Sequence, residues 1–434
     1  MNVAVAKTGK GRAVSDLFTS AEGRLPGSSA VTAVRREAFE TYERLGLPHR
    51  RIEEWKYTDL RALVGEVLPL AAAPDAAALK RAADAAKVHA IAGARKLVLV
   101  DGVFAADLSD VKALASEMGF KTLRETLDQD VDILKTASTD AVIALNAAMA
   151  TDGVVLSIAD GAQLSAPIQI IHIATAASVS AFTRSRVVIG KGVHATLIES
   201  FVAAGAKAYQ VNDAVILSVG DNADVAHIRL MDDAPDAVNI TSQFVTVGAN
   251  TKLNFFNMTT GAAVSRLQGF ITLAGEGSEL SANGVNLLQK TEHGDTTLVV
   301  DHAVPNCVSR EIFRAVIDDR AHSVFQGRII VRPDAQKTDG KMMTRALLLS
   351  DEAEADNKPE LEIFADDVSC GHGATAGALD DSLLFYLKAR GLPEKQAQAL
   401  LIQAFVGEAI EQIADDGLRE HVIGIAERWL ERRQ

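Results

Sequence analysis

The sequence predicts a mainly β protein in which a β-solenoid carries helical regions at both ends. Between about residues 153 and 378, short β-branched runs alternate with turn residues, and helical periodicity is nearly absent. Aromatic residues make up only 5% of the chain, so the core must be built from small aliphatic side chains. Four of the runs are followed by similar glycine-containing turns, whose first glycines lie 30, 28 and 27 residues apart at Gly190, Gly220, Gly248 and Gly275.

A regular spacing of strands and turns, with no helix between them, is typical of a solenoid whose coils hydrogen-bond to their neighbours. Glycine and asparagine in these turns tolerate the positive φ that the corners between faces require. An antiparallel sandwich is the alternative, but its turns usually recur every 8–12 residues without a longer period. We therefore expect stacked coils. An earlier copy of the repeat begins at Asp160, and looser copies lie at residues 318–320 and 350–352.

We expect three domains, which cover residues 1–150, 151–378 and 379–434. The first is an α/β region that is largely helical. Apolar residues recur there at helical spacing over residues 29–51, and a second helix is expected over the Ala- and Lys-rich residues 75–90. Between the helical stretches and the solenoid, residues 96–100 are expected to form a strand that ends in a turn.

The last domain is expected to be helical. Asp380 offers an N-cap for one helix, Gly391 is placed to end it, and Pro393 suits the first turn of the next. The second helix carries a wide apolar surface that includes Leu400, Leu401, Phe405 and Val406. Such a surface either packs on the solenoid or binds a partner, and the sequence leaves both interpretations open.

The net charge and the cysteine content limit the partners and the cellular compartment that we expect. The formal net charge is −13, with no Lys- and Arg-dense segment, so no nucleic-acid partner is expected. The two cysteines cannot form a disulfide framework and suit a reducing compartment. No run approaches 18 apolar residues, and the first residues lack a long apolar segment, so we expect a cytoplasmic protein with no membrane partner.

The sharpest chemical signal is Cys370-Gly371-His372. Residues two apart in a strand point to the same face, so the thiol and the imidazole would lie side by side. A thiolate beside an imidazole is a plausible donor pair for iron, zinc or an iron–sulfur cluster, although a buried thiol that packs as a small hydrophobe is the alternative. A cluster needs about four donors, so two residues would require a second chain to complete the site. Cys307 is expected to be structural.

Several segments resemble the SufB/SufD family of iron–sulfur cluster assembly proteins. The resemblance covers residues 300–413, including VDHAVPNCVSREIFRAVIDD and LEIFADDVSCGHGATAGALDD. The motif EEWKYTDL at residues 53–60 resembles the SufD branch. So does the stretch from His372 to Thr375, because the SufB branch typically has Glu after the histidine. The strand repeats fit the family's right-handed parallel β-helix.

The resemblance implies a non-catalytic scaffold subunit. Such a chain pairs with a SufB-like subunit through the β-helix and binds a SufC-like ABC ATPase through its C-terminal helices. The complex would build a transient iron–sulfur cluster that this chain shares with its partner. A reduced flavin has been associated with the family's complexes, and a homodimer of the isolated chain is left open.

The resemblance also assigns roles to residues. The family's cluster-site histidine corresponds to His372, and the neighbouring cysteine corresponds to Cys370. A SufB-type sulfur acceptor is one alternative, but the segment that would carry its cysteine reads Thr344-Arg345-Ala346 here. A β-helix enzyme acting on polysaccharide is the alternative from another class. The low aromatic content and the absence of a recognisable secretion signal disfavour it.

Overall fold

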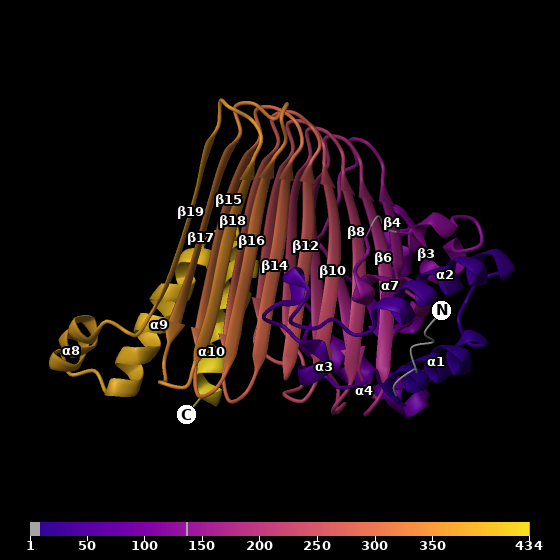
Figure 1. Ribbon diagram of the computed structural model, residues 1–434, viewed down its shortest axis with the longest axis horizontal. Coiled ribbons are helices and arrows are strands. Elements are labelled where there is room, and N and C mark those ends of the chain that lie inside the picture. The colour runs from indigo at the N-terminus through magenta and orange to yellow at the C-terminus, as the bar shows by residue number, and fades with distance from the viewer. Residues whose placement is uncertain (1–8, 136–137, 434) are drawn as a thin grey trace, which may run out of the picture.

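The computed structural model describes residues 9–135 and 138–433. Strands account for 39% and helices for 27% of the chain, and the strands form a β-solenoid of about eight turns. The mainly β fold with helices at both ends is therefore confirmed (Figure 1). Residues 1–8, which supplied part of the expectation about localisation, lie outside the described residues.

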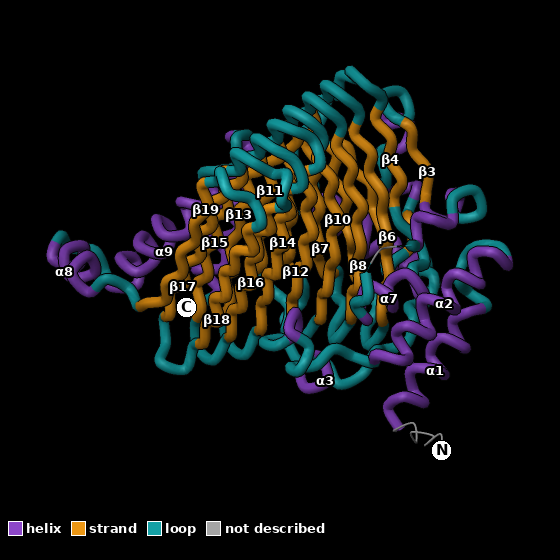
Figure 2. The backbone as a smooth tube through the Cα atoms, turned by 45° about the horizontal axis from the view of Figure 1, so that its top comes forward, coloured by secondary structure: helices purple, strands orange, loops and turns teal. Residues whose placement is uncertain are grey.

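Two long sheets form the faces of the solenoid, and each coil contributes one strand to each sheet (Figure 2). The first sheet has ten strands, in the spatial order β19 (Ser369–Gly377), β17 (Asp339–Leu348), β15 (Val308–Ile317), β13 (Glu279–Leu288), β11 (Lys252–Thr259), β9 (Asp224–Asp232), β7 (His194–Ala203), β5 (Ile168–Ala174), β1 (Arg95–Val100) and β2 (Val103–Phe104). The second has nine, in the order β18 (Glu354–Ile363), β16 (His322–Val331), β14 (His293–His302), β12 (Val264–Leu273), β10 (Val238–Val247), β8 (Gln210–Val219), β6 (Ser180–Ile189), β4 (Val154–Ile158) and β3 (Gly119–Thr122).

The pairing within each sheet is parallel from β4 to β19, which excludes the antiparallel sandwich. Among the strands of the described residues, only the pairs β1–β2 and β3–β4, at the N-terminal end, are antiparallel. The strand β1 matches the one expected at residues 96–100. It continues the first sheet because Arg95 pairs with Ile168 of β5. Strands from before residue 150 thus belong to the same two sheets as the repeats.

The corner glycines explain why the repeats keep their spacing. A Cβ atom at Gly275 would lie 1.9 Å from the backbone nitrogen of Ala249, one coil earlier, so only glycine allows the coils to stack this closely. Two residues later Gly277 has a φ of 71°, and the equivalent Asn250 has a φ of 51°. The turn pattern therefore combines a close backbone approach with a left-handed residue that turns the chain.

The helices of the N-terminal part cover the first coils of the solenoid (Figure 1). The two expected helices are present as α2 and α4, and Gly46 ends α2 with its N–H donating to the carbonyl of Tyr42. The helical segments of this part are α1 (Gly9–Glu22), α2 (Ser29–Leu45), η1 (Glu53–Trp55), α3 (Leu60–Leu63), α4 (Ala76–Val88), η2 (Ala106–Leu108), α5 (Val111–Leu114), α6 (Leu123–Thr126), η3 (Val131–Leu134) and α7 (Ala141–Met149).

Three helices follow the last strand: α8 (Asp381–Ala389), α9 (Glu394–Ile410) and α10 (Asp416–Arg432). Asp380 caps α8 as expected, and its carboxylate accepts hydrogen bonds from the backbone of the first turn. The sequence analysis described two helices here and missed α10 as a separate element. Helix α9 contacts β13 and β15, so its apolar side covers the outer face of the first sheet, whereas α8 stands clear of the strands (Figure 1).

None of the helices in the described ranges is both long enough and apolar enough to cross a membrane.

Candidate metal centre at the open end of the solenoid

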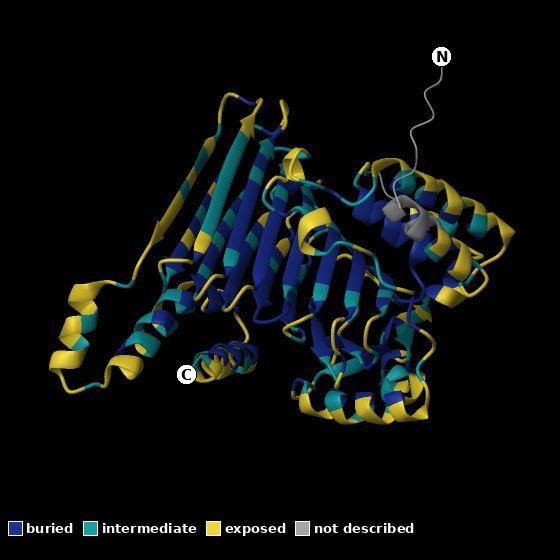
Figure 3. Ribbon diagram, turned by 60° about the horizontal axis from the view of Figure 1, so that its bottom comes forward, coloured by how far each residue is buried: buried dark blue, intermediate teal, exposed yellow. Residues whose placement is uncertain are grey.

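The two ends of the solenoid differ. Helices cover the N-terminal end, but β18 and β19 have no further strand beside them among the described residues. Burial falls toward this end, and β19 is largely exposed (Figure 3). Strand β19 contains no Asp, Glu, Lys or Arg, so it lacks the charges with which proteins usually protect an exposed edge. The C-terminal end is therefore an open and unprotected edge.

Cys370 and His372 both lie on this edge. They pair with Gly340 and Met342 of β17, and Met342 belongs to the apolar cluster between the sheets. The alternation of side chains along a strand therefore places both residues on the inward side of β19. Cys370 is half-buried and packs against the same apolar cluster, while His372 is exposed. The structure thus brings the expected pair to one face of one strand, at the rim of the solenoid.

The thiol of Cys370 is not activated in the free chain. Burial raises its pKa, and the charges of Asp339 and Glu311 act in the same direction, while a hydrogen bond from the backbone of Gly340 opposes them. The thiolate is the form that binds iron, so a metal must displace a proton from this sulfur. A cation arriving beside Cys370 would supply the missing positive charge.

The glycines around His372 have unequal surroundings. A Cβ atom at Gly371 would meet nothing within 4 Å, so the outer side of β19 is open there. A Cβ atom at Gly373 would lie 2.6 Å from Cε of Met343, which covers the strand at that point. The small residues therefore permit close approach of another chain at Gly371, and at Gly373 they accommodate a side chain of the neighbouring strand.

Thr344 and Cys307 occupy inner positions. Thr344 is buried and donates a hydrogen bond to the side-chain oxygen of Asn357, 3.0 Å away on β18, so the segment expected to hold a sulfur-accepting cysteine presents a hydroxyl instead. Cys307 is fully buried at a corner, where its sulfur lies 3.3 Å from Oγ of Ser278. These surroundings support a structural role for Cys307.

A buried carboxyl group that the sequence analysis missed lies beneath the open edge. Glu311 of β15 pairs with Met342, which in turn pairs with His372, so the three residues form one inward row. Burial raises the pKa of Glu311 to about 8. A charged residue at an inward position of a repeat could have revealed it, but only once the register of the coils was known.

The motif EEWKYTDL forms a strap across the outer face of the second sheet. Trp55 and Thr58 are fully buried there, and the guanidinium of Arg266 lies 3.9 Å from the ring of Trp55. Arg266 also donates to the carbonyl of Glu54 at 2.6 Å, and Oγ1 of Thr58 lies 2.9 Å from Nε2 of His293. The motif therefore fixes the N-terminal part onto strands β12 and β14, and Glu53 also reaches β18 through an ion pair with Lys358.

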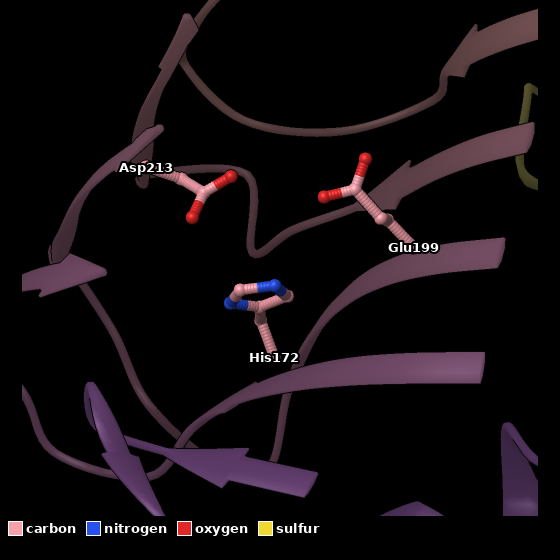
Figure 4. A group of neighbouring side chains, drawn as sticks. All are labelled: His172, Glu199 and Asp213. Carbon is pink, nitrogen blue, oxygen red and sulfur yellow. The ribbon is translucent and has the colours of Figure 1, made fainter. Parts of the chain in front are cut away.

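A second polar group that the sequence analysis missed lies inside the first coils. His172 on β5, Glu199 on β7 and Asp213 on β8 are all buried and point toward one another (Figure 4). Glu199, Arg229 and Asn257 form one inward row across β7, β9 and β11. The residues of this row are 30 and 28 positions apart, which matches the spacing of the corner glycines. That spacing is the sequence signal that could have revealed the row.

These features define a class of protein: a β-solenoid with one helix-covered end and one open end that carries a cysteine and a histidine. Residues 172–405 match the family described as "SUF system FeS cluster assembly, SufBD core domain", and residues 11–170 match "SufBD protein N-terminal region". The chain belongs to the SufBD family of iron–sulfur cluster assembly proteins.

Individual relatives agree with this assignment. The chain is 30% identical over 385 residues to the iron–sulfur cluster assembly protein SufD of Escherichia coli, an alignment that covers 88% of each chain. It is 29% identical over 401 residues to a SufBD family protein of Synechocystis, covering 87% of this chain and 86% of the relative. It is 27% identical over 307 residues to SufD of Bacillus subtilis, covering 66% of each. The chain is SufD-like and takes part in SUF iron–sulfur cluster assembly, which displaces the polysaccharide-enzyme alternative.

Proposed function

We propose that the chain is the SufD-type scaffold subunit of its assembly complex and pairs with a SufB-like subunit through the open end of the solenoid. The observation that carries the proposal is the exposed, uncharged edge of β19, next to Cys370 and His372. Unpaired backbone groups on such an edge form a template for a strand of another chain. A partner strand would extend the first sheet across the subunit boundary.

The neighbouring strand adds an apolar contribution to the same surface. Ile363 and Phe364, at the end of β18, are 41% and 60% exposed although both side chains are large and apolar. Burying such side chains contributes about 1.5–3 kcal/mol each when they leave water completely. The proposed interface thus combines main-chain pairing along β19 with apolar anchors beside β18, a combination that favours one partner orientation.

Cys370 and His372 would supply two of the donors for a nascent cluster at this interface. The thiolate and the imidazole are suitable iron ligands, and the partner subunit would contribute the remaining donors. The cluster is the cargo of the complex and does not stay with this chain. In this role the chain positions ligands and does not perform a catalytic step of its own.

The ATPase would bind mainly through α8. On the apolar surface of α9, Val406 is only 2% exposed and packs on the solenoid, which is one of the two interpretations that the sequence left open. Phe405 packs on the same cluster, and the guanidinium of Arg314 lies 5.8 Å from its ring. By contrast, Leu383, Phe385 and Leu400 remain 52%, 74% and 46% exposed.

Strand pairing is tested by placing a lysine on the edge. Thr375→Lys puts a charge on the outer side of the exposed edge strand β19, where a partner strand would pair, and we expect the chain to lose co-elution with the SufB-like subunit. Thr246→Lys is the matched control, because Thr246 is an exposed threonine on the central strand β10. Both variants should keep the circular dichroism of the wild type. Unchanged co-elution of the Thr375→Lys chain would refute pairing through β19.

A further inference from the structure

His172, Glu199 and Asp213 converge inside the solenoid, far along the chain from the open edge (Figure 4). One nitrogen or oxygen donor atom from each residue lies within 4.8 Å of the other two. His172 and Glu199 belong to the first sheet and Asp213 to the second, so the group spans the space between the two sheets. The stacking of the coils therefore fixes the backbone positions of the three residues relative to one another.

Each of the three residues has an atom without a partner. Nε2 of His172, Oε1 of Glu199 and Oδ2 of Asp213 are buried and have no hydrogen-bond partner within the described part of the chain. All three residues are more than nine-tenths buried. Leaving a buried polar atom unpaired is unfavourable, and more so for a charged group. A cation bound among the three residues would give these atoms a partner.

The charges in the cluster are unevenly matched. Oε2 of Glu199 lies 2.7 Å from Nε2 of His227 and 3.2 Å from Nε of Arg229, and it accepts a hydrogen bond from Gln243. Within residues 9–135 and 138–433, no cationic side chain forms an ion pair with Asp213, and Thr183 donates a hydrogen bond to Oδ1 of Asp213 at 2.5 Å.

A cavity of about 20 Å³ adjoins the imidazole. His172 and Thr183 line it, whereas Glu199 and Asp213 do not, so the cavity lies beside the three donor groups and not between them. A cavity of that size holds about one water molecule. Donors on opposite sides of a first-row ion are about 4.2 Å apart, given bonds of about 2.1 Å, so small side-chain rotations would complete the coordination.

We propose that His172, Glu199 and Asp213 bind one divalent first-row transition-metal ion, such as Fe²⁺, Co²⁺ or Zn²⁺, inside the first coils of the solenoid. An imidazole with two carboxylates suits these ions better than Mg²⁺ or Ca²⁺, which prefer oxygen ligands alone. The site contains neither Cys370 nor His372, so it does not depend on the proposed cluster role of the open edge.

The experiment uses the full chain with Cys370→Ser and His372→Ala, which removes the donors of the open edge. The protein is produced in Co²⁺-supplemented medium, desalted, and analysed for metal content and for visible d–d absorption. We expect about one Co²⁺ per chain, and X-ray absorption showing nitrogen and oxygen donors that include an imidazole. Asp213→Asn should lower Co²⁺ retention at least tenfold, because the amide keeps the shape of the carboxylate but loses its charge.

Asp152→Asn is the matched control. Asp152 is also a buried carboxyl group, but the backbone N–H groups of Phe104 and Gly153 donate hydrogen bonds to its two oxygens, so its substitution should leave retention unchanged. His172→Gln provides a second test if the Asp213→Asn chain does not fold. A folded parent chain that retains no Co²⁺, or Co²⁺ that remains bound in both Asp213→Asn and His172→Gln, would overturn the proposal. Retention of Mg²⁺ equal to that of Co²⁺ would overturn the transition-metal assignment.

Discussion

At the residue scale, the two thiols of the chain lie in different surroundings. Cys307 is enclosed at a corner of the solenoid, whereas Cys370 is half-buried at its open end. Burial raises the pKa of Cys370, so the free chain holds this thiol protonated at pH values where an ordinary exposed thiol would begin to ionise. The rate at which the Cys370 thiol is alkylated therefore measures its ionisation in the free chain, before a metal or a partner binds.

We predict that alkylation of Cys370 in the free chain rises with pH along a midpoint above 9, the ordinary value for a cysteine. The shift is upward because burial disfavours the charged thiolate. Cys307 should react only after unfolding, and Cys370→Ser identifies which signal belongs to which thiol. Rate measurement with iodoacetamide across pH 7 to 10.5 checks this, and a midpoint below 8 would show that the thiol is activated instead.

At the element scale, the C-terminal helices divide two tasks. Helix α9 covers the outer face of the first sheet, and Arg314 of β15 forms an ion pair with Glu408 of α9 at 2.6 Å. Helix α8 contacts α9 but leaves its own large apolar side chains exposed. The packing interpretation therefore holds for the apolar side of α9 around Val406, and binding of a partner through α8 is a prediction.

We predict that Phe385→Ala weakens binding of the SufC-like ATPase by about 2 kcal/mol or more, because large aromatic anchors dominate interface energies. Phe385 is the most exposed of the aromatic side chains on α8, so its loss should leave the thermal midpoint of the free chain unchanged. Val88→Ala on α4 is the control, because Val88 is 77% exposed and Phe385 is 74% exposed. Titration calorimetry with the isolated ATPase compares the two. Equal affinities would exclude α8 as the main contact.

At the scale of the whole molecule, the repeats explain what could be predicted. The spacing of Gly190, Gly220, Gly248 and Gly275 indicated the solenoid because the same corner geometry recurs in every coil. Helix α2 followed from the helical spacing of apolar residues, and α4 from its Ala- and Lys-rich composition.

Features that depend on pairing across long distances in the chain could not be predicted in the same way. The pairing of β1 with β5 depends on the register of two strands whose residues lie about 70 positions apart in the chain. The meeting of Asp213 with His172 depends on how the two sheets face each other. The Cys370–His372 pair was accessible from the sequence because both residues lie on one strand, whereas Glu311, two coils further in, was not.

The most direct measurement of the central claim is the iron and sulfide content of matched complexes. His372→Ala is assembled anaerobically with the SufB-like and SufC-like subunits, beside the wild type and the control His194→Ala, whose histidine is also exposed on the solenoid. If His372 donates to a cluster at the open edge, its variant should form the complex and keep its thermal midpoint, yet bind several-fold less iron and sulfide than either comparison. Wild-type iron and sulfide in the folded His372→Ala complex would contradict the account.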